Sequence, residues 1–151
     1  MKILIHPYSN NYDNKNAKNY PFWNELIYNL SKEHEINQIG IEEPLKNITH
    51  FYKNISFKNI KKVIEENDLW ISIDSFLPHY CKCYNLKSGI VLWGTSDPNI
   101  FGYKENRNLL KHRKYLRKNQ FLTWHNEKEN PDAFVDYEIV MNEVNNGCRN
   151  N

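Results

Sequence analysis

The chain has 151 residues, of which 40% are hydrophobic and 14% are aromatic, and its formal net charge is +2. This length suits one domain with a substantial buried core, and the hydrophobic content excludes a wholly disordered chain. The net charge is too small to indicate a nucleic-acid partner by itself.

The first part of the chain alternates apolar runs with amphipathic stretches. Residues 2–6 form an apolar run that ends before a proline, which predicts a buried strand. Over residues 21–33, apolar side chains recur with the i, i+3, i+4, i+7 spacing of a helix that buries one face. Further strands are predicted over residues 35–40 and, more weakly, over 49–52. Ser56 can cap the helix that follows, which carries apolar residues on one face.

The second part continues the alternation and then becomes less regular. Strands are predicted over residues 69–73 and 89–93, with a short helix over 78–84 between them. A small edge strand is predicted over residues 121–124. Asn130-Pro131 predicts the start of a final helix that Gly147 can end. This order predicts an α/β protein with a Rossmann-like three-layer α/β/α fold and a parallel sheet.

No repeat or linker interrupts this pattern, so a single domain is expected over residues 1–147, followed by a polar tail at 148–151. The N-terminus is too polar for a signal peptide and no apolar run is long enough to span a membrane, which predicts a cytoplasmic protein. Cys81, Cys83 and Cys148 are odd in number and lack C-x-x-C spacing, so neither a disulfide framework nor a metal site is expected.

Polar side chains follow three of the predicted strands, at the points where these strands end. In a parallel sheet, the carboxyl ends of the strands share one edge, where ligands bind. Taken singly, these residues also suit helix caps, turns or a solvated surface. Their common edge favours a binding site, for which the candidates are Ser9, Lys18, Asp74, Ser75, His79 and Thr95.

The chemistry of these residues suits a nucleotide with a sugar attached. The helix predicted after Ser75 offers unpaired N–H groups and the positive end of its dipole to a diphosphate, and Lys18 adds a positive charge. Asp74, which only accepts hydrogen bonds when ionised, suits sugar hydroxyls better than phosphate. Glu43, or Glu42 in the alternative register, follows the second strand, where an acid holds the ribose in dinucleotide-binding folds.

The order of these motifs resembles the donor-binding C-terminal half of glycosyltransferase family 9, the lipopolysaccharide heptosyltransferases. The family shows a strand ending in H-P-G, a K-x-W-P entry to the first helix, D-[ST]-G-x-x-H and F-G-x-[ST]-x-P. The stretches that carry the resemblance, within residues 2–98, are ILIHPYSN, KNYPFW, QIGIEE and DLWISIDSFLPHYCKCYNLKSGIVLWGTSDP. The resemblance implies the Rossmann-like donor half of the two-domain GT-B architecture.

The resemblance also implies roles at the matching positions. Ser9 and Lys18 would contact the donor diphosphate, and Ser75 would contact the phosphates. Glu43, or Glu42 in the alternative register, would contact the ribose. Asp74 would contact the donor sugar, and His79 would support that turn. Tyr8 and Phe76 replace family glycines. Because glycine permits positive φ and close backbone approach, these replacements predict a remodelled phosphate site or a different ligand.

The function expected from this resemblance is that of a glycosyltransferase-like protein that binds a nucleotide-diphosphate sugar donor. It would be a minimal or split form without the acceptor domain, completed by a homodimer mate or a separate acceptor-domain protein. In the family the general base belongs to that domain, so no catalytic residue is assigned. No cofactor other than the donor is expected. The alternative is a non-catalytic module that sequesters or senses a nucleotide or nucleotide-sugar.

A third hypothesis comes from the basic run at residues 111–118, in which Tyr115 could stack on a nucleobase. Such runs are more often the solvated face of a helix. The mostly acidic stretch at residues 127–138 would also offset its field. Nucleic acid is therefore not the expected partner.

Overall fold

The computed structural model describes residues 1–9, 16–124 and 127–149. Six strands form one parallel sheet in the order β3-β2-β1-β4-β5-β6. This is the strand order of doubly wound dinucleotide-binding folds. The strands are β1 (Lys2–His6), β2 (Glu35–Gly40), β3 (His50–Lys53), β4 (Leu69–Ile73), β5 (Ile90–Trp93) and β6 (Arg107–Leu110).

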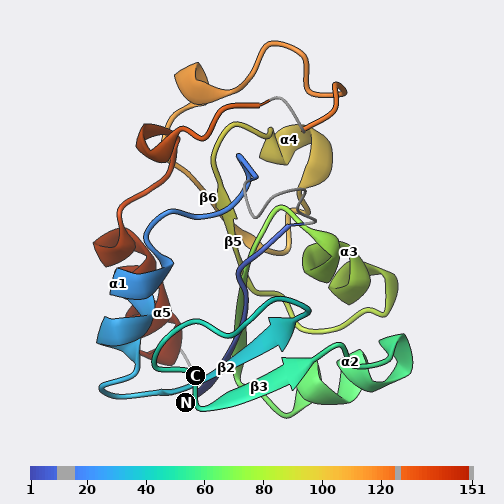
Figure 1. Ribbon diagram of the computed structural model, residues 1–151, viewed down its shortest axis with the longest axis vertical. Helices are drawn as coiled ribbons and strands as arrows, with labels where there is room; N and C mark the ends of the chain where they lie inside the picture. The colour runs from blue at the N-terminus through green and yellow to red at the C-terminus, as the bar shows by residue number, and fades with distance from the viewer. Residues whose placement is uncertain (10–15, 125–126, 150–151) are drawn as a thin grey trace.

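Helices cover both faces of the sheet. Figure 1 shows α1 and α5 on one side and α2 and α3 on the other. The predicted three-layer Rossmann-like α/β fold is therefore confirmed. The helices are α1 (Trp23–Leu30), α2 (Phe57–Glu65), α3 (Phe76–Cys83), α4 (Pro98–Phe101) and α5 (Tyr137–Arg149), with 3-10 turns at Arg113–Tyr115 and Pro131–Ala133.

Strand β4 shows why the sheet needs both helical layers. All five of its residues are buried. Ile71 and Ile73 belong to the core under α1 and α5, whereas Trp70 belongs to the core under α2 and α3. Successive strand side chains point to opposite faces, so a continuous apolar strand requires cover on each face.

The edge of the sheet differs from the sequence prediction. The edge strand predicted over residues 121–124 is wrong, because these residues form turns and bends, and β6 lies at Arg107–Leu110 instead. The side chains of β6 are only half-buried, so its sequence has no apolar run that marks a strand. Carbonyl groups at Leu122 and Thr123 accept hydrogen bonds from the Arg117 guanidinium rather than from a neighbouring strand.

Two helical predictions in the C-terminal third also need correction. The final helix begins at Tyr137, not at residue 130, and it runs through Gly147 to Arg149. Before it, Phe134 is buried against Gly94, where an added Cβ would lie 2.4 Å from the phenyl ring. This packing holds the chain extended between the 3-10 turn and α5. The basic run at 111–118 is not a helix face either, since it contains only a single 3-10 turn.

Candidate functional site

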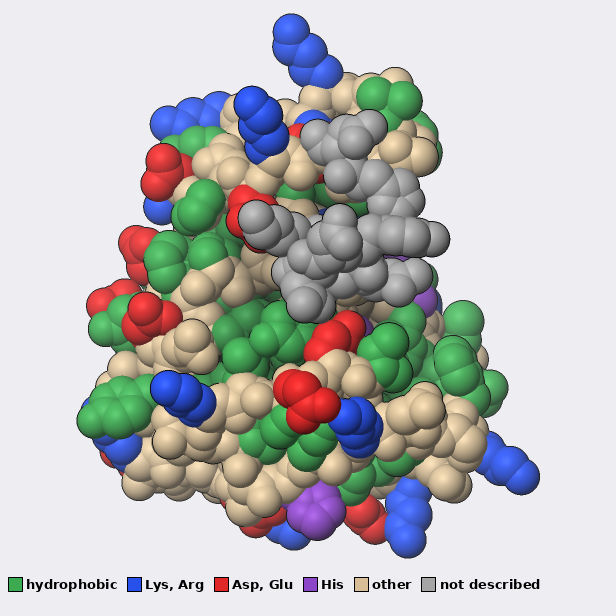
Figure 2. Space-filling view, viewed as in Figure 1, with side chains coloured by type: hydrophobic (Ala, Val, Ile, Leu, Met, Phe, Trp, Pro, Cys, Tyr) green, Lys and Arg blue, Asp and Glu red, His purple; other side chains and the backbone are tan. Residues whose placement is uncertain are grey.

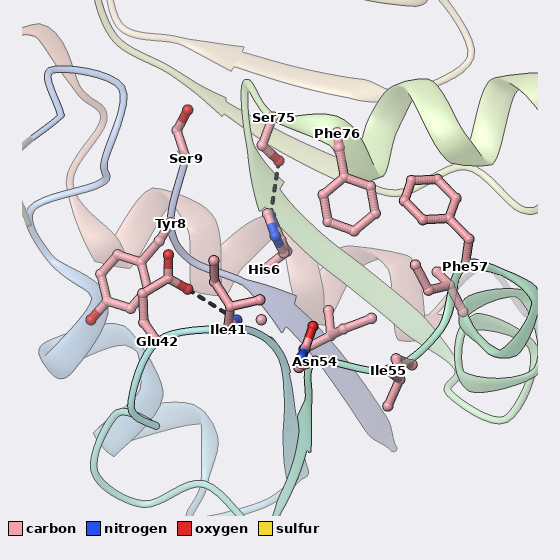
Figure 3. Close-up of a pocket in the computed structure, with 13 residues that line it drawn as sticks. His6, Tyr8, Ser9, Ile41, Glu42, Asn54, Ile55, Phe57, Ser75 and Phe76 are labelled. Atoms are coloured by element: carbon pink, nitrogen blue, oxygen red, sulfur yellow. Dashed lines mark hydrogen bonds between the residues drawn. The ribbon is translucent and has the colours of Figure 1, made fainter. Parts of the chain in front are cut away.

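A cavity of about 400 Å³ opens at the carboxyl ends of β1 to β4. The strand order reverses between β1 and β4, because the chain builds β2 and β3 on one side and β5 and β6 on the other. Open α/β sheets bind ligands in the crevice at such a switch point. Thirteen residues line the cavity, and they come from the ends of these four strands and from the start of α2 and α3 (Figure 3).

The walls of the cavity are largely apolar. Ile41, Ile55, Phe57 and Phe76 line it, and the two phenylalanine rings lie 6.0 Å apart at an angle of 48°. Among the described residues that line the cavity, none is Lys or Arg, and Glu42 is the single carboxylate. Such a lining suits a planar apolar group that carries hydroxyl donors nearby, and it does not suit a bare phosphate.

A hydrogen-bonded chain of side chains joins β1 to the end of β4 beside the cavity. The Nδ1 atom of His6 lies 2.9 Å from Oγ of Ser75, which lies 3.0 Å from Oγ of Ser72. The Ser72 hydroxyl donates to the carbonyl oxygen of Ile73. Burial lowers the pKa of His6 to about 4, so its imidazole is neutral at pH 7. The Ser75 hydroxyl is therefore already held by groups of the protein.

Tyr8 and Phe76, which stand where the motifs of glycosyltransferase family 9 have glycine, both line this cavity. Phe76 packs against the ring of His6 in a T-shaped contact, with the ring centroids 4.6 Å apart, and its phenyl ring points into the cavity (Figure 3). It fills space before the first turn of α3 that a glycine would leave open. Tyr8 lies at the opposite end with Glu42, and burial together with the Glu42 charge raises the pKa of the phenol.

Lys18 and Asp74 form a buried ion pair at the end of β4. The Nζ atom of Lys18 lies 2.8 Å from Oδ2 of Asp74. The same Nζ atom lies 4.5 Å from the centre of the Trp124 ring, and the Arg117 guanidinium lies 3.4 Å from that ring. Asp74 therefore neutralises the cation that the sequence places at this edge, and two aromatic–cation contacts position the pair.

Arg117 and Trp124 were missed by the sequence prediction. They lie in a segment without regular spacing, far along the chain from Lys18, so no local pattern places them at the strand ends. A basic run followed by an isolated tryptophan was the available signal, and it indicates a cation–aromatic contact only when the fold is known.

The acids after β2 differ in position. Glu42 lines the cavity, and its Oε2 atom accepts a hydrogen bond of 3.2 Å from the backbone N–H of Ile41. Glu43 does not line the cavity and forms a 2.6 Å ion pair with the exposed side chain of Lys53. The alternative register is therefore the one that brings a carboxylate to the cavity.

The remaining candidates are divided between the cavity and its surroundings. Ser9 lines the cavity, and its backbone N–H donates to Oδ1 of Asn19. His79 and Thr95 do not line it. Nδ1 of His79 lies 2.8 Å from the Tyr103 hydroxyl, and the buried Thr95 accepts hydrogen bonds at its carbonyl oxygen. The structure thus brings Ser9 and Ser75 together at the cavity and leaves His79 and Thr95 outside its lining.

Three further findings bear on function. Within the described ranges, no group of three or more His, Cys, Asp or Glu side chains is placed to hold a metal ion. No helix in those ranges has the length and apolar character needed to cross a membrane. Compared with known proteins, the chain matches no family model, no curated protein and no solved structure.

Proposed function

We propose that the protein binds a nucleotide-diphosphate sugar and forms the donor site of a glycosyltransferase. The observation that carries this proposal is the apolar cavity with one carboxylate at the switch point of the sheet. A nucleobase would lie against the rings of Phe57 and Phe76, and the ribose hydroxyls would donate to Glu42. The resemblance to the donor half of glycosyltransferase family 9 supports the same assignment.

The diphosphate would leave the cavity past Ser9 and Ser75 toward Lys18. The lining itself offers no Lys or Arg among its described residues, and Lys18, which pairs with Asp74 next to Ser75 in the chain, would receive this charge. A phosphate oxygen can accept from Lys18 while Asp74 accepts from hydroxyls of the sugar. In the transfer, the bond between the anomeric carbon and the phosphate oxygen breaks. A bond to the acceptor oxygen forms as the acceptor hydroxyl loses its proton, and the nucleoside diphosphate leaves with the electron pair of the broken bond.

A second candidate function is binding of a nucleotide without transfer. It is favoured by Phe76, whose ring points into the cavity where the family has a glycine. A second reason concerns Ser75 and Lys18, the two groups proposed to contact the phosphates. Ser75 is already hydrogen-bonded to His6, and Lys18 already forms an ion pair with Asp74. Both groups must exchange a protein partner for a ligand partner, which reduces the net gain from each contact.

Calorimetry with ADP, UDP, GDP and their sugar esters tests the proposal. The Glu42→Gln variant is expected to bind the preferred ribonucleotide about tenfold more weakly, which is about 1.4 kcal/mol. It should also lose the preference for that nucleotide over its 2′-deoxy analogue. Glu43→Gln is the matched control, because Glu43 is an adjacent acid whose partner, Lys53, lies on the surface.

The possible results separate the two functions. Absence of binding for every nucleotide and nucleotide-sugar would overturn the proposal. Binding with transfer of the sugar to an added acceptor and release of nucleoside diphosphate, abolished by Asp74→Asn, would establish the transferase. Tight binding that survives Asp74→Asn, with no product, would establish the non-catalytic module.

A further inference from the structure

Two large apolar side chains lie in solvent at the end of the molecule that holds α4. Phe121 is 80% exposed and Leu122 is 61% exposed, and we call this pair the apolar tip. A T-shaped contact with the ring of Phe101, 5.9 Å between centroids, supports Phe121 from one side. Contiguous exposed apolar side chains mark interaction surfaces more often than single ones do, so this adjacent pair is a candidate contact surface.

The backbone beneath the apolar tip is held by two buried polar side chains. The guanidinium of Arg117 donates to the carbonyl oxygens of Gln120 and Leu122, at 2.9 and 2.5 Å. The side-chain amide of Gln120 donates to the carbonyl oxygen of Thr95 and accepts from the backbone N–H of Asp97. These bonds fix the turn in the conformation that directs Phe121 and Leu122 outward, so their exposure does not come from a loose loop.

A basic run precedes the apolar tip in the sequence. Residues 111–118 carry five Lys and Arg residues and no acid. Lys111, Arg113 and Arg117 are paired with carboxylates, whereas Lys114 and Lys118 have no ion pair among the described residues. Figure 2 shows Lys and Arg side chains projecting at this end of the molecule, at the top of the view, beside hydrophobic side chains.

We propose that the apolar tip docks on an anionic lipid surface. Phe121 and Leu122 would enter the boundary between headgroups and acyl chains, while Lys114 and Lys118 would lie among the anionic headgroups. Charge complementarity is the reason for choosing this partner, since an exposed apolar pair that follows two lysines without ion pairs in the chain matches an apolar layer beneath negative charge. The proposal does not depend on which ligand the cavity holds.

The small size of the contact sets the expected strength. One acyl anchor alone gives an association constant on the order of 10⁴ M⁻¹, and two side chains with two lysines belong to the same weak class. Binding should therefore be reversible and should weaken as salt screens the lysines.

Sedimentation of the full chain with lipid vesicles tests the proposal. The vesicles contain either phosphatidylcholine alone or equal parts of phosphatidylcholine and phosphatidylglycerol. The test variants are Phe121→Ser/Leu122→Ser and Lys114→Glu/Lys118→Glu, all at surface positions. The matched control is Tyr28→Ser/Lys32→Glu, which removes another exposed aromatic side chain and the lysine whose Nζ atom lies 4.5 Å from its ring.

The expected result is co-sedimentation with the anionic vesicles, a loss of at least tenfold in each test variant and no change in the control. Absence of binding, or equal binding to both vesicle types, would overturn the proposal. Two parallel measurements cover other occupants of the tip. Analytical ultracentrifugation detects self-association, and fluorescence anisotropy with a labelled single-stranded RNA detects nucleic-acid binding. If either is abolished by the tip variant while vesicles are not bound, the lipid proposal fails.

Discussion

The two sides of the switch point satisfy their polar groups in different ways. On the β1-β2-β3 side, the cavity is walled by apolar side chains, and Glu42 there contacts only a backbone N–H among the hydrogen bonds of the described residues. On the β4-β5-β6 side, carboxylates meet cations: Asp74 pairs with Lys18 and Asp97 pairs with Arg113. The first side has a cavity that a ligand can enter, whereas the charged side chains of the second side form ion pairs with each other.

This difference shows that polar residues at a strand end are not all available for binding. Asp97 caps α4 by accepting from the backbone N–H of Asn99 and also accepts two bonds from Arg113. These bonds lower the pKa of its carboxyl group, with the Arg113 hydrogen bonds as the largest cause. Both Asp74 and Asp97 follow the end of a strand, yet Asp74 directly precedes a residue of the cavity lining, whereas Asp97 is engaged by Asn99 and Arg113.

The largest expected effect comes from breaking the ion pair on the charged side. Lys18→Met leaves Asp74 buried without its cation, and we expect a loss of about 3 kcal/mol in the free energy of unfolding. The double variant Lys18→Met/Asp74→Asn should recover most of this loss, because the remaining amide is neutral. Urea unfolding measures both values. Equal losses in the single and double variants would show that the pair contributes no charge compensation.

A smaller loss of stability is expected when the pH is lowered, and it comes from His6 on the cavity side. The pKa of His6 falls from 6.5 in the unfolded chain to about 4 in the folded protein. Between these values the unfolded state binds more protons, so the contribution of His6 to stability is lost as pH falls. At pH 5 this amounts to about 2 kcal/mol.

The measurement is the difference in unfolding free energy between pH 7 and pH 5. His6→Asn should reduce this difference by about 2 kcal/mol, whereas His50→Asn, at an exposed position, should leave it unchanged. The same pH dependence in His6→Asn and the unmodified protein would contradict the assignment to His6.

The smallest effect separates the two tasks of Asp97. Asp97→Asn keeps an oxygen that can cap α4 but loses the charge that meets Arg113, so we expect a loss of about 1 kcal/mol. Asp97→Ala removes the cap as well and should cost about 1 kcal/mol more. Thermal and urea unfolding of the two variants give the comparison. Equal costs would mean that the cap contributes nothing.

The sequence predicted the strands and helices best where local periodicity and burial agree. Strand β4 lies at the predicted residues 69–73, and α2 begins directly after Ser56, the predicted cap residue. Residues 107–124 were predicted poorly, because β6 is half-buried and the turn after it is shaped by side chains such as Arg117. Such contacts join residues that are distant in the sequence, so they produce no regular spacing of residue types from which a strand or helix could be predicted.

For the candidate site, local sequence patterns were sufficient to predict the parallel α/β architecture and a group of polar residues at one sheet edge. These follow from side-chain periodicity and from the common direction of the strands. Which side chains reach the cavity depends on long-range packing, which places Glu42 there and Glu43 on the surface. It also gave Lys18 its partners, Asp74 and Trp124, because long-range packing selects a partner from many chemically equivalent residues.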